Sequence, residues 1–242
     1  MKALLLAAGI GSRLRPLTNH IPKCLAPICG IPLIDIWLRT LDYAGVDSFL
    51  INTHYMAEVV EAHITKSRFA KWIEVKREPE LLGTAGSIRA YRDWVGNGDT
   101  IIIHADNLSI CDYRAFVDTF HNRPKGIIGT MMTFTTNSPE SCGIVSLDST
   151  GRIRRYWEKD QLAEGNLANA AVYLASPEFC DIIVKSDAFD ISREVIPSIH
   201  HRLNVFHNDV YHRDIGTLES FALAQIEFPR LGRAWPDIVF RQ

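Results

Sequence analysis

The feature that most constrains this 242-residue sequence is an apolar run at its start that breaks directly into a glycine-rich segment. Residues 1–8, Met-Lys-Ala-Leu-Leu-Leu-Ala-Ala, are apolar except for Lys2, which predicts a strand buried on both faces of a sheet. Gly9 and Gly11 follow at once. Because glycine has no side chain, a phosphate can approach the backbone there, and the following amides can point at its charge. The start of the chain therefore predicts a polyphosphate site at the end of the first strand.

Positive charge is concentrated near this segment and is not spread over the chain. Arg13, Arg15 and Lys23 follow the glycines closely, whereas the whole sequence has 26 Lys and Arg against 28 Asp and Glu, a net charge of −2. Nucleic-acid-binding proteins typically carry a broad basic surface, which this balance does not favour. We therefore expect a local anion site and no nucleic-acid partner.

The two best-known glycine motifs for nucleotides are absent from the sequence. The dinucleotide-binding motif G-x-G-x-x-G requires a third glycine where this chain has Leu14. The Walker A motif G-x-x-x-x-G-K-[ST] does not occur either. The predicted polyphosphate site is therefore of another kind.

Hydrophobic periodicity predicts the fold class. The order strand, helix, strand, helix, strand is typical of an α/β protein with a mostly parallel central sheet and helices on both faces. Neither an internal repeat nor a low-complexity linker divides the sequence, so we expect residues 1–242 to form a single domain. After the first strand, the predicted helices are residues 32–41 and 57–64, and the predicted strands are residues 48–53, 72–77 and 99–105.

The first loop resembles the signature of the sugar-1-phosphate nucleotidyltransferases, which join a nucleoside triphosphate to a sugar 1-phosphate and release pyrophosphate. The resemblance implies a Rossmann-like (GT-A-like) nucleotidyltransferase fold and extends over residues 1–228. Many members continue into a β-helix of short repeats, which we do not expect in residues 1–242. It also implies that Arg13 and Lys23 act in catalysis and that Ala8, Gly9 and Gly11 bind the nucleotide. The matching residues are Gly9, Gly11, Arg13, Pro16, Leu17, Thr18, Pro22 and Lys23, in this order.

A second glycine-containing segment, Leu82-Gly83-Thr84-Ala85-Gly86, resembles the nucleoside-binding loop of the same family. The resemblance implies nucleotide binding by Gly83, Thr84 and Gly86. Glu78 and Glu80 precede this loop, and a carboxylate can accept hydrogen bonds from the guanine ring and its amino group. The segment is similar to the mannose- and heptose-1-phosphate guanylyltransferases, so GTP is favoured, while UTP, dTTP and CTP stay open.

Two acidic residues resemble the metal ligands of the family. Asp106 follows the predicted strand 99–105, and Asp214 lies in a segment, Asp214-Ile215-Gly216-Thr217, that resembles the family's D-I-G-T. Carboxylate oxygens are ligands that Mg²⁺ prefers, so both residues are expected to bind Mg²⁺ and to act in catalysis. Ala105 stands where the family usually has glycine.

The sugar-phosphate side of the family pattern is matched by four residues farther along the chain. The resemblance implies that Lys159 contacts the phosphate of the sugar and that Asn169 lies near the sugar hydroxyls. Two positions depart from the pattern, with Asp160 in place of proline and Ala171 in place of glycine. The four expected sugar-phosphate residues are Gly143, Glu158, Lys159 and Asn169.

The remaining expectations concern the cellular location, the oligomeric state and the alternative functions of the protein. Five scattered cysteines without a C-x-x-C pair favour reduced thiols and a cytoplasmic protein. We expect no signal peptide and no membrane span, and a monomer or a homodimer. Two other functions stay open: nucleotidyl transfer to an amino-sugar phosphate or another small phosphate such as phosphocholine, and a non-catalytic regulator that binds a sugar nucleotide.

Overall fold

The computed structural model describes residues 1–231, which cluster into two compact units. Within the described residues, the first unit consists of Met1–Leu81, His104–Tyr113 and residues 210–231, and the second of Leu82–Ile103 and Arg114–Asp209. That residues 1–242 act as a single domain stays a prediction, and most of the segment after the resemblance, residues 232–242, lies outside the described part of the chain.

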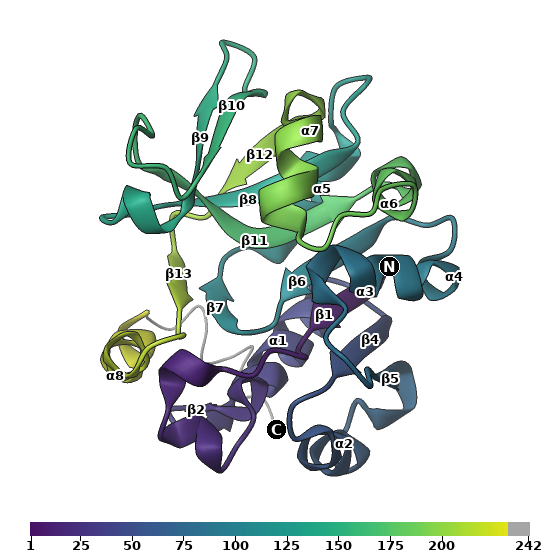
Figure 1. Cartoon of the computed structure of the whole chain (residues 1–242), viewed down its shortest axis with the longest axis vertical. Helices are drawn as coiled ribbons and strands as arrows, with labels where there is room; N and C mark the ends of the chain where they lie inside the picture. The colour runs from purple at the N-terminus through teal and green to yellow at the C-terminus, as the bar shows by residue number, and fades with distance from the viewer. Residues whose placement is uncertain (232–242) are drawn as a thin grey trace. The chain divides into compact units, whose positions relative to one another are not determined.

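The first unit is built on three parallel strands in the order β1–β4–β5, which lie side by side (Figure 1). The apolar residues of β1 are inaccessible to solvent from Ala3 to Leu5, which confirms the predicted buried strand. The predicted order of strands and helices is also confirmed. These elements are β1 (Lys2–Leu6), α1 (Leu33–Tyr43), β4 (Ser48–Thr53), α2 (Ala57–Thr65) and β5 (Ile73–Arg77).

Shorter elements complete the first unit. The loop after β1 consists of the short 3-10 helices η1 (Ser12–Leu14), η2 (Leu17–Asn19) and η3 (Lys23–Leu25), and a further one, η4 (Ala70–Trp72), precedes β5. Two antiparallel pairs follow: β2 (Pro27–Ile28) with β3 (Ile31–Pro32), and β7 (Asn107–Ile110) with β13 (Tyr211–Asp214). The last elements of the described residues are α8 (Leu218–Glu227) and η8 (Phe228–Arg230).

The second unit is organised around β11 (Leu167–Ala175), which pairs antiparallel with β6, β8 and β9. Farther out, β10 pairs antiparallel with β9, and β12 pairs parallel with β8. The α/β class is confirmed. The central strand pairs of the first unit are parallel, and those of the second unit are mainly antiparallel. The other strands are β6 (Thr100–His104), β8 (Gly129–Thr135), β9 (Gly143–Leu147), β10 (Ile153–Glu158) and β12 (Leu203–His207).

Helices of the second unit are short, and His104 and Tyr113 at the ends of β6 and α5 cluster with the first unit. A π-helix, Ile191–Val195, leads directly into α7. The helices are α3 (Gly83–Ala90), α4 (Arg92–Val95), α5 (Tyr113–His121), α6 (Pro177–Val184) and α7 (Ile196–Ile199), with 3-10 turns η5 (Pro139–Ser141) and η7 (His200–Arg202).

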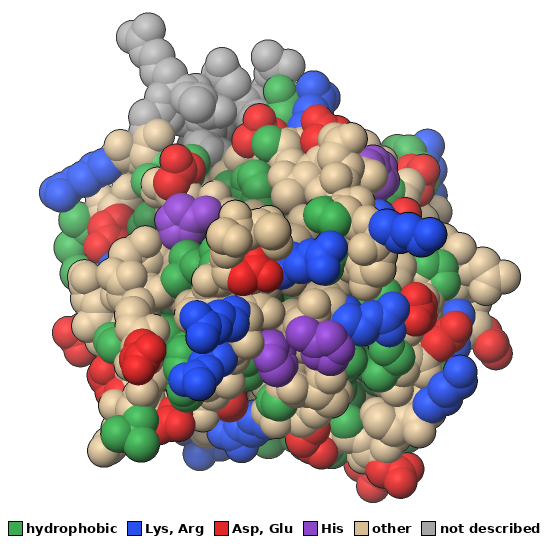
Figure 2. All heavy atoms as spheres, turned by 90° about the horizontal axis from the view of Figure 1, so that it is seen from above, with side chains coloured by type: hydrophobic (Ala, Val, Ile, Leu, Met, Phe, Trp, Pro, Cys, Tyr) green, Lys and Arg blue, Asp and Glu red, His purple; other side chains and the backbone are tan. Residues whose placement is uncertain are grey.

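Charged side chains of both signs are interspersed on the face shown in Figure 2, in keeping with the net charge of −2. Within residues 1–231, every helix is too short or too polar to cross a membrane.

An ion pair between two helices makes the first unit sensitive to pH. His63 of α2 lies 2.9 Å, from Nε2 to Oδ1, from Asp35 of α1, and the hydrogen bond to this carboxylate raises the pKa of His63. A raised folded-state pKa means that the pair stabilises the fold fully below the unfolded pKa of about 6.5 and loses this contribution as pH rises through the higher folded value.

We therefore expect wild type to be more stable than His63→Gln by about 1 kcal/mol at pH 6, with the difference shrinking at higher pH. Urea unfolding of both proteins at pH 6, 7, 8 and 9 measures this difference. A difference that grows with pH would contradict the assignment of the proton to this pair.

Candidate active site

The loop after β1 is compact around Gly11. Gly11 has a φ of +67°, and a Cβ at this position would lie 3.0 Å from Thr18 Cγ2 and 3.1 Å from Lys23 Cβ. Its carbonyl accepts a hydrogen bond of 2.8 Å from the Thr18 hydroxyl. Both the left-handed backbone and the close packing therefore require glycine. Gly9 differs, because the space where its Cβ would lie is open and leaves room for a ligand near the backbone.

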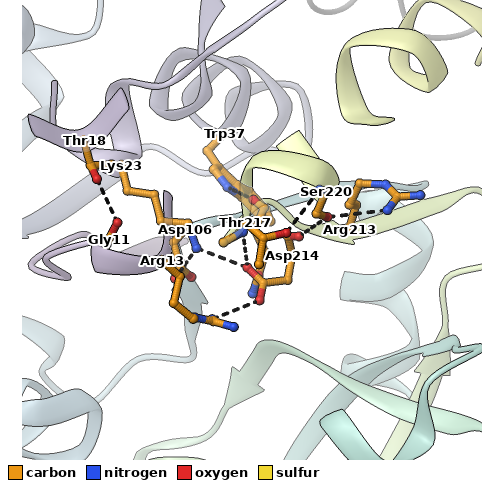
Figure 3. A network of polar contacts seen from close by, with 12 residues as sticks. Gly11, Arg13, Thr18, Lys23, Trp37, Asp106, Arg213, Asp214, Thr217 and Ser220 are labelled. Atoms are coloured by element: carbon orange, nitrogen blue, oxygen red, sulfur yellow. Dashed lines mark hydrogen bonds and ion pairs between the residues drawn. The ribbon is translucent and has the colours of Figure 1, made fainter. Parts of the chain in front are cut away.

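Lys23 connects the loop to both predicted metal-binding residues (Figure 3). Its Nζ donates to Asp106 Oδ2 at 2.8 Å and to Asp214 Oδ1 at 3.1 Å. The Lys23 side chain is only 5% exposed, whereas the carboxylates of Asp106 and Asp214 are 44% and 51% exposed. The structure therefore brings together three of the four predicted catalytic side chains, with the two acids open to solvent and the lysine behind them.

The fourth, Arg13, contacts Asp214 of the same cluster directly, in a space that Gly216 leaves open. Arg13 lies 3.4 Å from Asp214 Oδ2, and the amide of Gly216 donates to Asp214 Oδ1 at 2.8 Å. A Cβ on Gly216 would lie 2.8 Å from Asp214 Oδ1 and 2.9 Å from Arg13 Nη2. Glycine in the D-I-G segment is thus needed for the approach of Asp214 and Arg13.

Asp106 is held at the exit of β6 by its neighbours in sequence. The amide of Ala105 donates to the carbonyl of Leu6 at the end of β1, at 3.1 Å. The indole of Trp37 in α1 donates to the carbonyl of Asn107 at 2.9 Å. Ala105 itself is fully buried, so the alanine found in place of the family's glycine fits without exposing apolar surface.

Opposite charge keeps Asp106 ionised and Lys23 protonated. Desolvation opposes ionisation of Asp106, but the charge of Lys23, with smaller contributions from His104 and from hydrogen bonds, holds its pKa below the ordinary value. Desolvation likewise opposes protonation of Lys23, and the two carboxylates outweigh it and raise the pKa of Lys23. At neutral pH an ionised Asp106 therefore lies beside the protonated, buried Lys23.

The donor set fits Mg²⁺. Two carboxylate oxygens from different segments lie within 3.1 Å of a single cationic atom, so both can point at one positive centre. Among residues 1–231, no group of three or more His, Cys, Asp or Glu could hold a metal ion. Mg²⁺ commonly takes one or two protein carboxylates and completes its octahedron with water and phosphate oxygens, which two aspartates allow.

Glu78 and Glu80, the two predicted base-recognition residues, lie in different surroundings. Glu78 is 2% exposed, and its Oε1 accepts a hydrogen bond of 2.8 Å from Asn52 at the end of β4. Asn52 in turn accepts from the amide of Ala7, at 2.6 Å, just before the buried Ala8. Glu78 thus supports the start of the glycine loop, a role that sequence reasoning missed. Glu80 is exposed and can meet a ligand.

In the second unit, the Leu82–Gly86 segment forms the start of α3 and packs on residues 189–191. The amide of Ala85 donates to the carbonyl of Phe189 at 3.0 Å, and a Cβ on Gly83 would clash with this carbonyl. The hydroxyl of Thr84 accepts from the amide of Ile191 at 2.8 Å. Gly86 lies close to Leu82, at 3.2 Å from a built Cβ. Nucleotide binding by Gly83, Thr84 and Gly86 stays a prediction, and the contacts show that this segment also holds residues 189–191.

Three of the four predicted sugar-phosphate residues, Gly143, Glu158 and Asn169, lie around one network, because Asn169 also donates to the hydroxyl of Tyr156 at 3.4 Å. The hydroxyl of Tyr156 donates to Glu158 Oε2, and a Cβ on Gly143 would clash with both side chains. Asn169 donates to the hydroxyl of Tyr173 at 2.7 Å, which lies 3.2 Å from the hydroxyl of Ser192. Sequence reasoning missed Tyr156, Tyr173 and Ser192. Tyr156 had a usable signal, because residues two apart on a strand share a face and Tyr156 precedes Glu158 by two.

Lys159 lies next to this network but takes no part in its hydrogen bonds among the described residues. Its amide donates to the carbonyl of Cys142 at 3.1 Å, its side chain is exposed, and its φ is +50°. A lysine in the left-handed region is uncommon, and such strain is frequent where a ligand is bound. Contact of Lys159 with a phosphate stays a prediction.

Ala171, which replaces the family's glycine, also has a left-handed backbone, with a φ of +54°. The pairing of β11 with β8 shifts register between Asn169 and Tyr173, so Ala171 lies in a β-bulge, a place that favours glycine. The Asn169 carboxamide accepts from the amide of Ala171 at 2.9 Å and holds this conformation.

We expect Ala171→Gly to raise the free energy of unfolding by up to about 1 kcal/mol, because the left-handed region penalises a Cβ. Ala170→Gly, at a buried position of the same strand outside the left-handed region, is the matched control and should be destabilising. Thermal and urea unfolding measure both variants. Destabilisation by Ala171→Gly would show that the bulge is not strained.

Comparison with known proteins gives one family and a group of relatives. The sequence matches the nucleotidyl transferase family over residues 2–229. It is 29% identical over 226 residues to the mannose-1-phosphate guanylyltransferase catalytic subunit beta of Xenopus tropicalis, covering 91% of this chain and 62% of the relative. It is 33% identical over 207 residues to mannose-1-phosphate guanylyltransferase 1 of Arabidopsis thaliana, covering 82% of this chain and 56% of the relative. The chain thus spans about three fifths of the length of these relatives.

The fold has a counterpart among solved structures. A crystal structure from Bacillus anthracis, described as a glucose-1-phosphate thymidylyltransferase in complex with sucrose, superposes with a TM-score of 0.83. The alignment covers 94% of each chain at 23% sequence identity. At this identity the likeness concerns the fold alone.

Proposed function

Because the chain belongs to the nucleotidyl transferase family, we propose that it transfers a nucleotidyl group from a nucleoside triphosphate to a sugar 1-phosphate. The products are a nucleoside diphosphate sugar and pyrophosphate. The observation that carries the proposal is the buried Lys23 shared by Asp106 and Asp214, next to the glycine loop. The guanylyltransferase names of the relatives support a sugar 1-phosphate as acceptor and GTP as donor.

In the proposed reaction an oxygen of the sugar phosphate attacks the α-phosphorus, and the bond from that phosphorus to the pyrophosphate oxygen breaks. The reaction requires no covalent enzyme intermediate, so the chain contributes by positioning and by neutralising phosphate charge. Arg13 and Lys23 neutralise the triphosphate and the leaving pyrophosphate. Asp106 and Asp214 would hold Mg²⁺, which supplies further positive charge when bound.

The second unit supplies the proposed sugar-phosphate residues. The hydrogen bond from Tyr156 fixes the carboxylate of Glu158, which can then accept from a sugar hydroxyl with its free lone pairs. The Asn169 carboxamide is fixed in the same way by Tyr173 and by the amide of Ala171. Lys159, exposed beside them, would contact the phosphate of the sugar.

The choice of base is proposed to depend on Glu80. Of the two glutamates, Glu80 is exposed, while Glu78 is buried on Asn52. If Glu80 accepts from the guanine amino group, GTP should be used about 5-fold to 150-fold better than ITP, which lacks that group, because an unpaired polar group costs about 1–3 kcal/mol.

Glu80→Gln should reduce this ratio of kcat/KM values, whereas Glu78→Gln should lower stability and leave the ratio nearly unchanged. Equal use of GTP and ITP by the wild type would remove the carboxylate argument. A preference for UTP, dTTP or CTP would remove the guanylyl assignment and leave the phosphate chemistry in place.

Two alternatives are tested by the same assay. A non-catalytic regulator would bind a nucleoside diphosphate sugar and release no pyrophosphate. A transferase for phosphocholine would release pyrophosphate with that acceptor and not with sugar 1-phosphates. We also propose that the protein is cytoplasmic, which its five free cysteines support. We further propose that it acts as a monomer or homodimer.

A further inference from the structure

A bidentate ion pair joins β13 to α8 directly beside Asp214. Arg213, the residue before Asp214, donates through Nε to Glu227 Oε2 at 2.8 Å and through Nη2 to Glu227 Oε1 at 2.7 Å. The hydroxyl of Tyr211 on the same strand donates to Glu227 Oε2 at 2.9 Å. The Arg213 and Glu227 side chains are 25% and 33% exposed, so water screens their charges only in part. The planar guanidinium therefore fixes both the distance and the direction of β13 relative to the end of α8.

The first turn of α8 contacts the backbone of Asp214. Thr217 caps the helix, and its hydroxyl accepts from the amide of Ser220 at 3.2 Å. The hydroxyl of Ser220 donates to the carbonyl of Asp214, and Arg213 Nη1 donates to this hydroxyl at 3.4 Å (Figure 3). Arg213 thus contacts both the first turn and the last residue of α8, and Ser220 links the helix to the peptide group of Asp214.

The same helix holds the segment that follows Lys23. The carboxamide of Gln225 in α8 accepts from the amide of Cys29 at 2.7 Å and donates to the carbonyl of Pro27 at 2.8 Å. These two residues lie in the β2–β3 hairpin, which begins four positions after Lys23. Helix α8 is therefore bonded to the chain close to both partners of the contact between Lys23 Nζ and Asp214 Oδ1.

Strand pairing alone gives Asp214 little support. β13 has four residues and pairs with β7 in a two-stranded sheet, where Asp214 is the last residue of its strand and lies opposite Asn107. A two-stranded ribbon is marginally stable by itself. The contacts with α8 are thus needed to keep the backbone of Asp214 in place.

We propose that α8 positions the carboxylate of Asp214 against Lys23. The positioning residues are Arg213, Ser220 and Glu227, and they act through the backbone. Because the side chain of aspartate is short, a displacement of the Asp214 backbone displaces its carboxylate. The contact with Lys23 is 3.1 Å long, so a shift of about 1 Å breaks this hydrogen bond. The consequence for turnover rests on the proposed function, in which Asp214 would hold Mg²⁺, whereas the consequence for the contact does not.

Lys23 reports on the contact without metal or substrate. The full chain is labelled with ¹³C in its lysines, and the Cε–Hε signal of Lys23, assigned by its absence from Lys23→Ala, is followed by NMR. Asp214→Asn shows where this signal lies when the charge of Asp214 is lost. We expect Glu227→Gln and Ser220→Ala each to move the Lys23 signal toward that position. Ser220→Ala keeps the ion pair, so it tests the positioning even if Glu227→Gln lowers stability.

Glu61→Gln is the matched control. Arg77 donates to the two carboxylate oxygens of Glu61 at 3.0 and 2.9 Å, the same bidentate geometry in the same unit, but neither residue belongs to α8 or β13. This variant should leave the Lys23 signal and turnover unchanged. A Lys23 signal that stays at its wild-type position in both Glu227→Gln and Ser220→Ala overturns the proposal, whatever the stability of these variants.

Turnover separates the positioning from the proposed function. If Asp214 holds Mg²⁺, Glu227→Gln should lower kcat about 10-fold to 100-fold, the range found when a partner of a metal-binding group is lost, and leave the KM of the sugar 1-phosphate within about twofold. A shifted Lys23 signal with unchanged kcat, or in a chain whose wild type has no transferase activity, supports the positioning and contradicts the proposed function. An unchanged Lys23 signal in the variants of an active enzyme overturns the positioning alone.

Discussion

Replacing Asp106 by alanine is expected to lower turnover about a hundredfold to a thousandfold, the range found when one group that stabilises transition-state charge is removed. Asp106 accepts from the buried Lys23 at 2.8 Å and is one of the two carboxylates that fit Mg²⁺. Its loss would remove a proposed metal ligand and leave Lys23 with Asp214 alone. The measurement is kcat for pyrophosphate release at saturating triphosphate, sugar 1-phosphate and Mg²⁺.

Asp106→Asn separates charge from shape, since it keeps the side-chain volume and should be nearly as inactive as the alanine variant. Asp47→Ala is the control, because the Asp47 side chain is 74% exposed and pairs with the N-terminus. Far-UV circular dichroism checks that each variant is folded. Activity of Asp106→Ala within tenfold of the wild type, or full activity in excess chelator, would exclude the metal assignment.

Lys23→Ala is expected to impair both catalysis and stability. From the sequence alone, Lys23 would be expected to be a solvated phosphate ligand whose removal hardly affects the fold. The structure changes this expectation, because the Lys23 side chain is 5% exposed and is the cation between Asp106 and Asp214. Without Lys23, the neighbouring carboxylates of Asp106 and Asp214 lose the cation that they share.

We therefore expect Lys23→Ala to lose about 1–3 kcal/mol of stability, the usual cost of losing a hydrogen bond to a charged partner, besides a large fall in kcat/KM. Mg²⁺ should restore more stability to Lys23→Ala than to the wild type, because a cation that binds only the folded state replaces the missing charge. Urea unfolding with and without Mg²⁺ measures both effects. If Mg²⁺ stabilises the two proteins equally, Mg²⁺ does not replace the charge of Lys23 between Asp106 and Asp214.

The elements of the first unit could be predicted because their signals are local. An unbroken apolar run marks β1, and helical spacing marks α1 and α2, each within a few residues of the observed bounds. Gly11 could be identified as a loop glycine for the same reason, although its contacts with Thr18 and Lys23 could not.

The closeness of Asp106 and Asp214 in space could not be derived from the residues, because 108 positions separate them and no periodicity links distant strand ends. It was expected only from the family resemblance. The surroundings of Glu78 could not be predicted from the sequence near it either. A glutamate before a glycine-rich loop suggests contact with a ligand, yet its carboxylate is buried on Asn52, and burial of a side chain depends on neighbours far away in the sequence.

Product formation with both substrates tests the central claim most directly. The full chain is incubated with Mg²⁺, each of GTP, UTP, dTTP, CTP and ATP, and each of a panel of sugar 1-phosphates. The amounts of pyrophosphate and of the nucleoside diphosphate sugar are then both measured, the latter by mass spectrometry. We expect at least one pair, with GTP as donor, to give equal amounts of the two products, and neither product without the acceptor or with Asp106→Ala. Failure of the folded wild type to form a nucleoside diphosphate sugar from any pair, or pyrophosphate release that does not depend on the acceptor, would contradict the account.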